Sequence, residues 1–105
     1  MIVVNSRNAA DFMDFNRLYA NALDSYKACV QPDDNEDLQT QVQIPLGDIV
    51  PAPEWIKIQF FGTDTDHYIT ETRLKLLSQS DEEIGWYSIL EDENGNCMDD
   101  YLVFE

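Results

Sequence analysis

His67 is the only histidine of this 105-residue chain and the first candidate for chemistry. It follows Asp66 and stands near Asp64, so a carboxylate is available to orient the imidazole ring. A pair of this kind can act as a general base or supply two metal ligands. The same residues are typical of an exposed turn or strand start, and no nucleophile motif or second histidine accompanies them. We therefore interpret His67 as an exposed structural residue and expect no enzymatic activity.

Two acidic stretches have the spacing of calcium ligands. The first three ligand positions of an EF-hand loop are matched twice, by Asp33, Asn35 and Asp37 and by Asp92, Asn94 and Asn96. The glycine and the bidentate glutamate that such a loop requires are missing from both stretches. Two cysteines and one histidine also fall short of the usual set of zinc ligands. We predict no metal site and no cofactor.

The two cysteines, Cys29 and Cys97, are far apart in the sequence. Residues 1–4 carry neither the basic charge nor the long apolar run of a secretion signal. We therefore expect a cytoplasmic protein with two reduced thiols. A disulfide between the two cysteines stays open as an alternative.

The composition is strongly acidic. Asp and Glu number 21 against 6 Lys and Arg, which gives a formal net charge of -15 at pH 7. This charge repels a nucleic-acid backbone and an anionic membrane surface, and no apolar run approaches the ~18 residues of a membrane-spanning helix. Hydrophobic residues make up 44% of the chain, enough for a packed core rather than a disordered acidic tail. We expect no direct binding to nucleic acid or membrane.

The negative charge is concentrated in two segments. Residues 31–54 contain acids and no bases, and nine acids follow Lys75, the last basic residue. Uncompensated acids repel one another and create a field that accelerates encounter with a basic partner. On neighbouring strands they would present negative charge at regular intervals, broadly as a nucleic-acid backbone does. Alternatively, the charge serves only solubility.

Aromatic residues near the late acids complete the candidate interface. Trp and Tyr side chains rimmed by acids have the composition of a hot spot for an Arg- or Lys-rich partner, although they are also typical core residues. The predicted partner-binding residues are Asp81, Glu82, Glu83, Trp86, Glu91, Asp92, Glu93, Asp99, Asp100 and Tyr101. Because Asp99 and Asp100 are adjacent, a strand would place one on each face of its sheet.

Apolar residues at helical spacing predict an amphipathic helix that starts near Asn8 and stops before Pro32. Its stripe contains Phe12, Phe15, Leu18, Tyr19, Ala22, Leu23, Tyr26, Cys29 and Val30. Asn8 and Asp11 resemble a capping box. Asp14 and Arg17 are spaced for an ion pair on the polar side of the helix.

Alternating apolar residues predict an antiparallel sheet in the second half of the chain. The expected strands are 55–61, 67–78, 84–91 and 97–104, and shorter strands at 2–4 and 41–46 stay open. Asn94-Gly95 is the strongest short signal for a two-residue hairpin turn, which would pair Tyr87 with Leu102.

These elements predict one α+β domain over residues 1–105, with the N-terminal amphipathic helix packed on an antiparallel meander sheet of about four to five strands. On this fold, the charge favours a small acidic inhibitor. It would be an immunity protein or a phage- or plasmid-type nucleic-acid mimic that blocks the basic site of a toxin, a nuclease or another nucleic-acid-handling enzyme. The alternative is an oligomeric or small-ligand-binding structural module of cystatin-like outline, including a homodimer formed through one face of the sheet.

Overall fold

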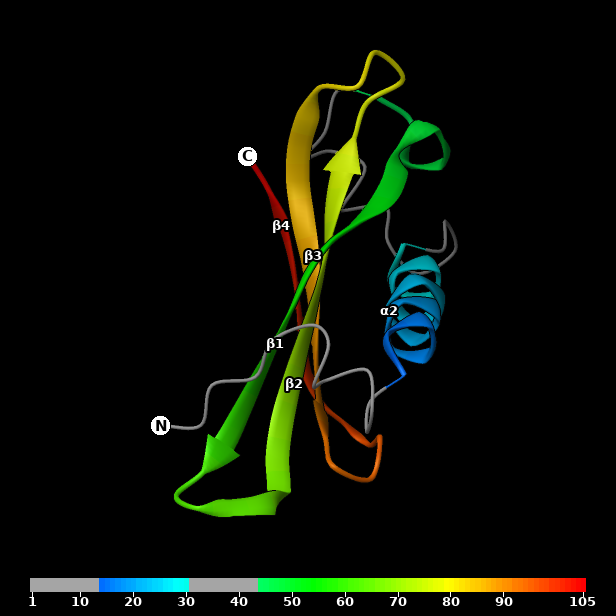
Figure 1. The fold of residues 1–105 in the computed structure, drawn as a ribbon. Coiled ribbons are helices and arrows are strands. Elements are labelled where there is room, and N and C mark those ends of the chain that lie inside the picture. The colour runs from blue at the N-terminus through cyan, green and yellow to red at the C-terminus, as the bar shows by residue number, and fades with distance from the viewer. Residues whose placement is uncertain (1–13, 31–43) are drawn as a thin grey trace.

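The computed structural model describes residues 14–30 and 44–105 of the chain. Its elements are α2 (Phe15–Cys29), the short 3-10 helix η1 (Leu46–Asp48), β1 (Val50–Phe61), β2 (Asp64–Leu77), β3 (Glu83–Asp92) and β4 (Cys97–Phe104). The strands form one antiparallel sheet in the order β1-β2-β3-β4, and α2 packs on one of its faces (Figure 1). The predicted α+β fold, a helix on an antiparallel meander, is confirmed.

The helix begins later than predicted. Asp14 has extended backbone angles and caps α2, because its carboxylate accepts a 3.1 Å hydrogen bond from the backbone N–H of Arg17. This bond satisfies one of the amide groups that the first helical turn leaves without a partner. The predicted start near Asn8 is therefore wrong for this helix, and the expected Asp14–Arg17 ion pair is replaced by the cap. Asn8, Asp11 and Phe12 themselves lie outside the described residues.

The strands match the predicted ones closely, with two extensions. β2 starts at Asp64 rather than residue 67. β1 starts at Val50 rather than residue 55 and so includes Pro51 and Pro53. Proline is tolerated there because β1 is an edge of the described sheet, where an N–H is not needed for pairing on both sides. The predicted strand at 2–4 lies outside the described residues, and so does the first half of 41–46. The remainder of that stretch is not a strand, since Leu46 opens η1.

The predicted pairing of the last two strands is confirmed, but the predicted turn is wrong. Tyr87 lies opposite Leu102, as expected. The backbone N–H of Asp92 bonds the carbonyl of Asn96 at 3.0 Å, which closes a three-residue loop rather than a two-residue turn. Gly95 takes the left-handed conformation in this loop, with φ 82°, a value that glycine adopts without strain.

The core lies between α2 and the sheet. Thr70, Thr72, Leu74 and Leu76 alternate along β2 and are all buried on the helix side, as their spacing predicts. The buried apolar core is made of Ala22, Tyr26, Leu46, Ile49, Leu74, Leu76, Tyr87 and Ile89. Tyr26 of α2 meets Tyr87 of β3 edge to face, with ring centroids 5.7 Å apart. One face of the sheet is thus fixed against the helix, and the side chains on the other face point away from it.

Candidate functional site

The ten predicted partner-binding residues lie along the β3–β4 hairpin and the turn that leads into it. Asp81, Glu82 and Glu83 stand at its open end, whereas Asp92 and Glu93 stand at its tip. The ten residues of β3 separate the two groups by about 33 Å, at the usual rise of ~3.3 Å per residue. The acids are therefore distributed along the hairpin and do not form one compact patch.

The open end of the hairpin is an exposed acidic turn. Ser78 organises it: its hydroxyl accepts hydrogen bonds from the backbone N–H of Ser80 at 3.3 Å and of Glu82 at 3.2 Å. Asp81 occupies the left-handed region with φ 64°, which aspartate tolerates better than most residues. Glu105, absent from the predicted binding residues, joins this end because its backbone N–H donates to the carbonyl of Ile84 at 2.9 Å.

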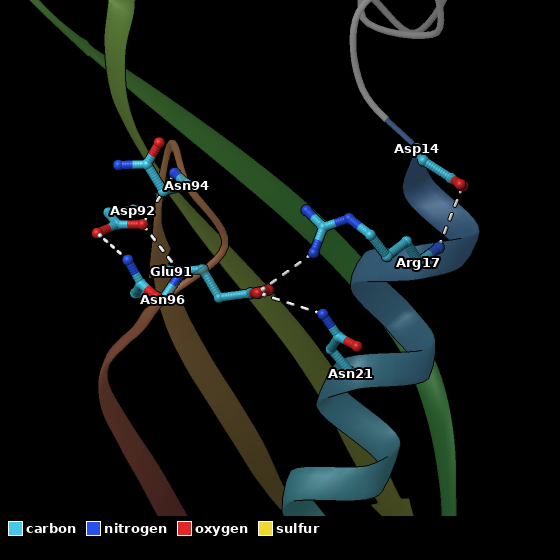
Figure 2. A network of polar contacts seen from close by, with 7 residues as sticks. All are labelled: Asp14, Arg17, Asn21, Glu91, Asp92, Asn94 and Asn96. Carbon is cyan, nitrogen blue, oxygen red and sulfur yellow. Dashed lines mark hydrogen bonds and ion pairs between the residues drawn. The ribbon is translucent and has the colours of Figure 1, made fainter.

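Glu91 departs most from expectation, because it is buried and has a counterion. Its side chain is only 2% exposed and points from β3 toward α2 (Figure 2). Oε1 lies 3.6 Å from Nη1 of Arg17 and accepts a 3.4 Å hydrogen bond from the side-chain amide of Asn21. The expectation that no late acid has a cation partner is therefore wrong at Glu91. In this conformation Glu91 attaches the helix to the sheet and is not presented to a partner.

Asp92 uses its carboxylate to hold the hairpin tip together (Figure 2). Oδ1 accepts hydrogen bonds of 2.9 Å from the backbone N–H groups of both Asn94 and Asn96, and Oδ2 accepts one of 3.3 Å from the Asn96 side chain. These bonds, first of all that from the Asn96 backbone, lower the pKa of Asp92 below its ordinary value. In the second of the two stretches with calcium spacing, the side chain of Asp92 thus binds Asn94 and Asn96, whereas Asp33, Asn35 and Asp37 lie outside the described residues. Within 14–30 and 44–105, no three His, Cys, Asp or Glu side chains gather as metal ligands.

Asp99 and Asp100 point to opposite faces of the sheet, as their adjacency predicts. Asp100, on the helix side, accepts a 2.8 Å hydrogen bond from the hydroxyl of Tyr87. Burial and this bond raise the pKa of Tyr87 far above its ordinary value of 10.0. Asp99, on the other side, accepts 2.9 Å hydrogen bonds from the hydroxyl of Tyr101 and from the backbone N–H of Asp100. Both carboxylates lie on an exposed strand.

Trp86 is positioned by a cation of the same sheet face rather than by the acids. The guanidinium carbon of Arg73 lies 3.7 Å from the ring centroid of Trp86 and 4.5 Å from that of Trp55. Nε of Arg73 also donates a 3.0 Å hydrogen bond to Ser88. Lys57 covers the Trp55 ring at 4.4 Å. This group of aromatic and cationic side chains was not predicted from the sequence. Its signal lay in Trp55 and Lys57 alternating on one strand, but only the register of β1 and β2 brings Arg73 to them.

The remaining candidates for chemistry are His67 and the two cysteines. His67 is exposed near the start of β2. Cys29 and Cys97 are thiols rather than a disulfide, and burial raises the pKa of both. Among the described residues, no helix is both long and apolar enough to cross a membrane.

The charged residues of the hairpin therefore remain the outstanding feature. Of the nine acids that follow Lys75, Glu91 is the one that forms an ion pair within the described part of the chain. The others are Asp81, Glu82, Glu83, Asp92, Glu93, Asp99, Asp100 and Glu105, which we term the acidic strip. No known protein family matches the chain, and no curated protein or solved structure is significantly similar to it.

Proposed function

We propose that this protein binds a basic protein through the acidic strip and blocks the site at which that partner would bind nucleic acid or another polyanion. The observation that carries the proposal is the absence of ion pairs along the strip, in the part of the chain that the structure describes. Carboxylates without cation partners repel one another and lower the stability of the fold. A basic counterpart would relieve that repulsion.

The length and charge of the strip support a polyanion mimic. Eight charges over about 33 Å average roughly one per 4 Å, close to the 3.4 Å per charge of one DNA strand, and they form one group at the open end of the hairpin and one toward its tip. The strip runs along the β3–β4 hairpin, and β4 is an edge strand of the described sheet. On β4, the side chains of Met98 and Tyr101 are 56% and 48% exposed. These two side chains would add apolar contact beside the charges.

The proposed mechanism involves steric and electrostatic occlusion, with no catalysis. The long-range field of the strip accelerates encounter by about 10- to 1000-fold at low salt, and the accelerated step slows steeply as salt rises. The partner's own cationic groups are then covered and cannot reach phosphate. Such an inhibitor would act in the cytoplasm, where toxins and nucleic-acid-handling enzymes meet their antagonists.

The test compares the native chain with a neutralised strip. We would immobilise the protein, capture partners from its native cells and elute them with salt. The variant E82Q/E83Q/E93Q/D99N removes four charges from the strip, and the control D24N removes one exposed charge from α2. We expect the native chain and D24N to capture the same basic protein and to displace it from DNA, with association at least ~10-fold slower for the strip variant. Equal capture by the strip variant, or an association rate independent of salt, would overturn the proposal.

A further inference from the structure

The face of the sheet opposite α2, which we term the open face, carries side chains that a second protein layer would bury. In the described part of the chain, α2 is the one α-helix on the sheet, and it packs on the other face (Figure 1). Both tryptophans of the chain, Trp55 and Trp86, lie on the open face, together with Tyr101. Trp, Tyr and Arg are the residues that dominate the energetics of protein interfaces.

Two neighbouring rows of side chains cross the open face from β1 to β4. The register gives the first row as Trp55, Arg73, Ser88 and Tyr101. It gives the second row as Lys57, Glu71, Leu90 and Asp99. The ends of these rows are complementary: the second row ends in a cation on β1 and in an anion on β4, and the first row ends in an aromatic ring on both strands.

We propose that a second copy of this chain stacks on the open face about a two-fold axis that runs parallel to the strands, between β2 and β3. This axis exchanges β1 with β4 and β2 with β3 while each row stays at its own level. Lys57 of one copy then faces Asp99 of the other, and Trp55 faces Tyr101. Because a two-fold interface is self-complementary, each of these contacts forms twice.

The charges on the open face allow this burial. Arg73 is the most central cation, and it already has Glu71 at 3.4 Å, two tryptophan rings and Ser88 as partners. Closing the face therefore buries Arg73 with its partners in place, and an unpaired charge there would be costly. Lys75, on the same strand, would face the Trp86 ring of the other copy. The face carries Lys57, Arg73 and Lys75 against Glu71, Asp99 and Asp92, the last of which lies opposite Ile69 of β2. Cations and acids are thus equal in number among these residues, whereas the whole chain has a net charge of -15.

The size of the open face meets the requirement for a specific dimer. Four strands spaced about 4.8 Å apart and about 33 Å long give a face of roughly 600 Å², or about 1,200 Å² counted over both copies. Specific interfaces begin at about 1,200 Å² in total. The two sheets would pack about 10 Å apart, with the two α2 helices on the outside.

A charge-swap experiment tests both the dimer and its axis. The full chain, K57D, D99K and the double variant would be compared by sedimentation velocity at one ionic strength, after circular dichroism confirms that each is folded. We expect a native mass of twice 12.1 kDa, a dissociation constant about tenfold weaker in each single variant, and recovery in K57D/D99K, where the pair re-forms with reversed sign. The control K27D makes the same charge change as K57D on α2, and we expect no effect from it.

Tryptophan fluorescence provides a second, local measurement. Because Trp55 and Trp86 are the only tryptophans and both lie on the open face, their emission should shift to longer wavelength when dilution separates the copies. A native chain that is monomeric at all concentrations, a dimer that K57D and D99K leave intact, or a double variant that fails to recover would overturn the proposal. Asp99 belongs to the acidic strip, but Lys57 does not, and no basic protein is present in these measurements. The K57D variant and its control K27D therefore distinguish a failure of the dimer from a failure of the proposed function.

Discussion

Arg17 of α2 lies 3.6 Å from Glu91 of β3, and this contact is one of the polar attachments of the helix to the sheet. The two side chains differ in exposure, with 48% for Arg17 and 2% for Glu91. A carboxylate buried to this degree is destabilising unless it has partners, and Arg17 and Asn21 supply them at one of its two oxygens. The other oxygen, Oε2, is buried without a hydrogen-bond partner. Losing the ion pair therefore destabilises the protein more when it leaves the buried Glu91 unpaired than when it leaves the exposed Arg17 unpaired.

The first prediction follows from this asymmetry. Arg17→Ala leaves a buried carboxylate without its cation, so we expect it to lower the free energy of unfolding by about 1–2 kcal/mol, a value that allows for the exposure of Arg17. Glu91→Gln keeps the shape and leaves Arg17 able to turn toward water, so it should cost less. Urea unfolding at neutral pH measures both, with Lys27→Ala on the same helix as the control. A larger loss for Glu91→Gln than for Arg17→Ala would contradict this account.

The two core tyrosines should respond in opposite ways to loss of the hydroxyl. Tyr87 donates a 2.8 Å hydrogen bond to Asp100, whereas the buried hydroxyl of Tyr26 has no partner. We expect Tyr87→Phe to destabilise the protein by about 1.5–3 kcal/mol, the range for hydrogen bonds to charged groups. Tyr26→Phe should be neutral or stabilising, because it removes an unsatisfied polar atom. Thermal unfolding of the two variants checks this difference, and equal losses would show that the Tyr26 hydroxyl has a partner in solution.

Stability should fall at alkaline pH. Burial, with a smaller contribution from Cys29, raises the pKa of Tyr26 to about 12, and the pKa of Tyr87 is raised as well. In the unfolded chain a tyrosine titrates near ~10. Its contribution is therefore fully present below pH ~10 and is lost as the pH rises toward the folded value. Unfolding measured between pH 8 and pH 11 should show the loss, and Tyr26→Phe should reduce it. A native stability that stays constant over this interval would contradict the prediction.

The hairpin tip should depend on the acceptor oxygens of Asp92. Asp92→Ala removes the acceptor for the N–H groups of Asn94 and Asn96, whereas Asp92→Asn retains one acceptor oxygen. Hydrogen exchange of these two amides should accelerate strongly in the first variant and less in the second. Because the pKa of Asp92 is lowered in the fold, its contribution is present above the ordinary value of 3.8 and is lost as the pH falls below it. Exchange that is equally slow in the native chain and in Asp92→Ala would show that the carboxylate does not hold the loop.

The pairing register of β3 and β4 could be predicted from the sequence, but the type of turn that joins the two strands could not. Asn94-Gly95 predicts a two-residue turn, yet the loop has three residues, because the side chain of Asp92 accepts hydrogen bonds from Asn94 and Asn96. On β4, Met98 is left without a partner between the pairs Glu91–Cys97 and Leu90–Asp99. This bulge compensates for the extra loop residue and restores the predicted pairing from Leu90 onward. Alternating apolar residues on both strands favour that register, since a slip by one residue would turn them to the wrong face.

The sequence predicted which residue types make up the candidate site, but not how their side chains are arranged. The excess of acids after Lys75 and the opposite directions of Asp99 and Asp100 follow from the sequence alone. The burial of Glu91 does not, because its cation comes from a helix whose packing over β3 no local pattern specifies. The contact of Arg73 with both tryptophans likewise requires the register of three strands. The periodicity of one segment cannot predict contacts between residues that are distant in the sequence.

The pairing of β3 with the end of β4 depends on a glycine. At Gly85, an added Cβ would overlap the carbonyl oxygen of Val103 and stand 3.1 Å from Cα of Phe104, both backbone atoms that cannot swing aside. We expect Gly85→Ala to push β4 away and to cost about 2 kcal/mol or more in urea unfolding. Gly47→Ala is the matched control, because nothing lies within 4 Å of the added Cβ there and the backbone is not left-handed. That variant should be neutral or slightly stabilising. Equal stability of the two variants would show that β4 tolerates displacement opposite Gly85.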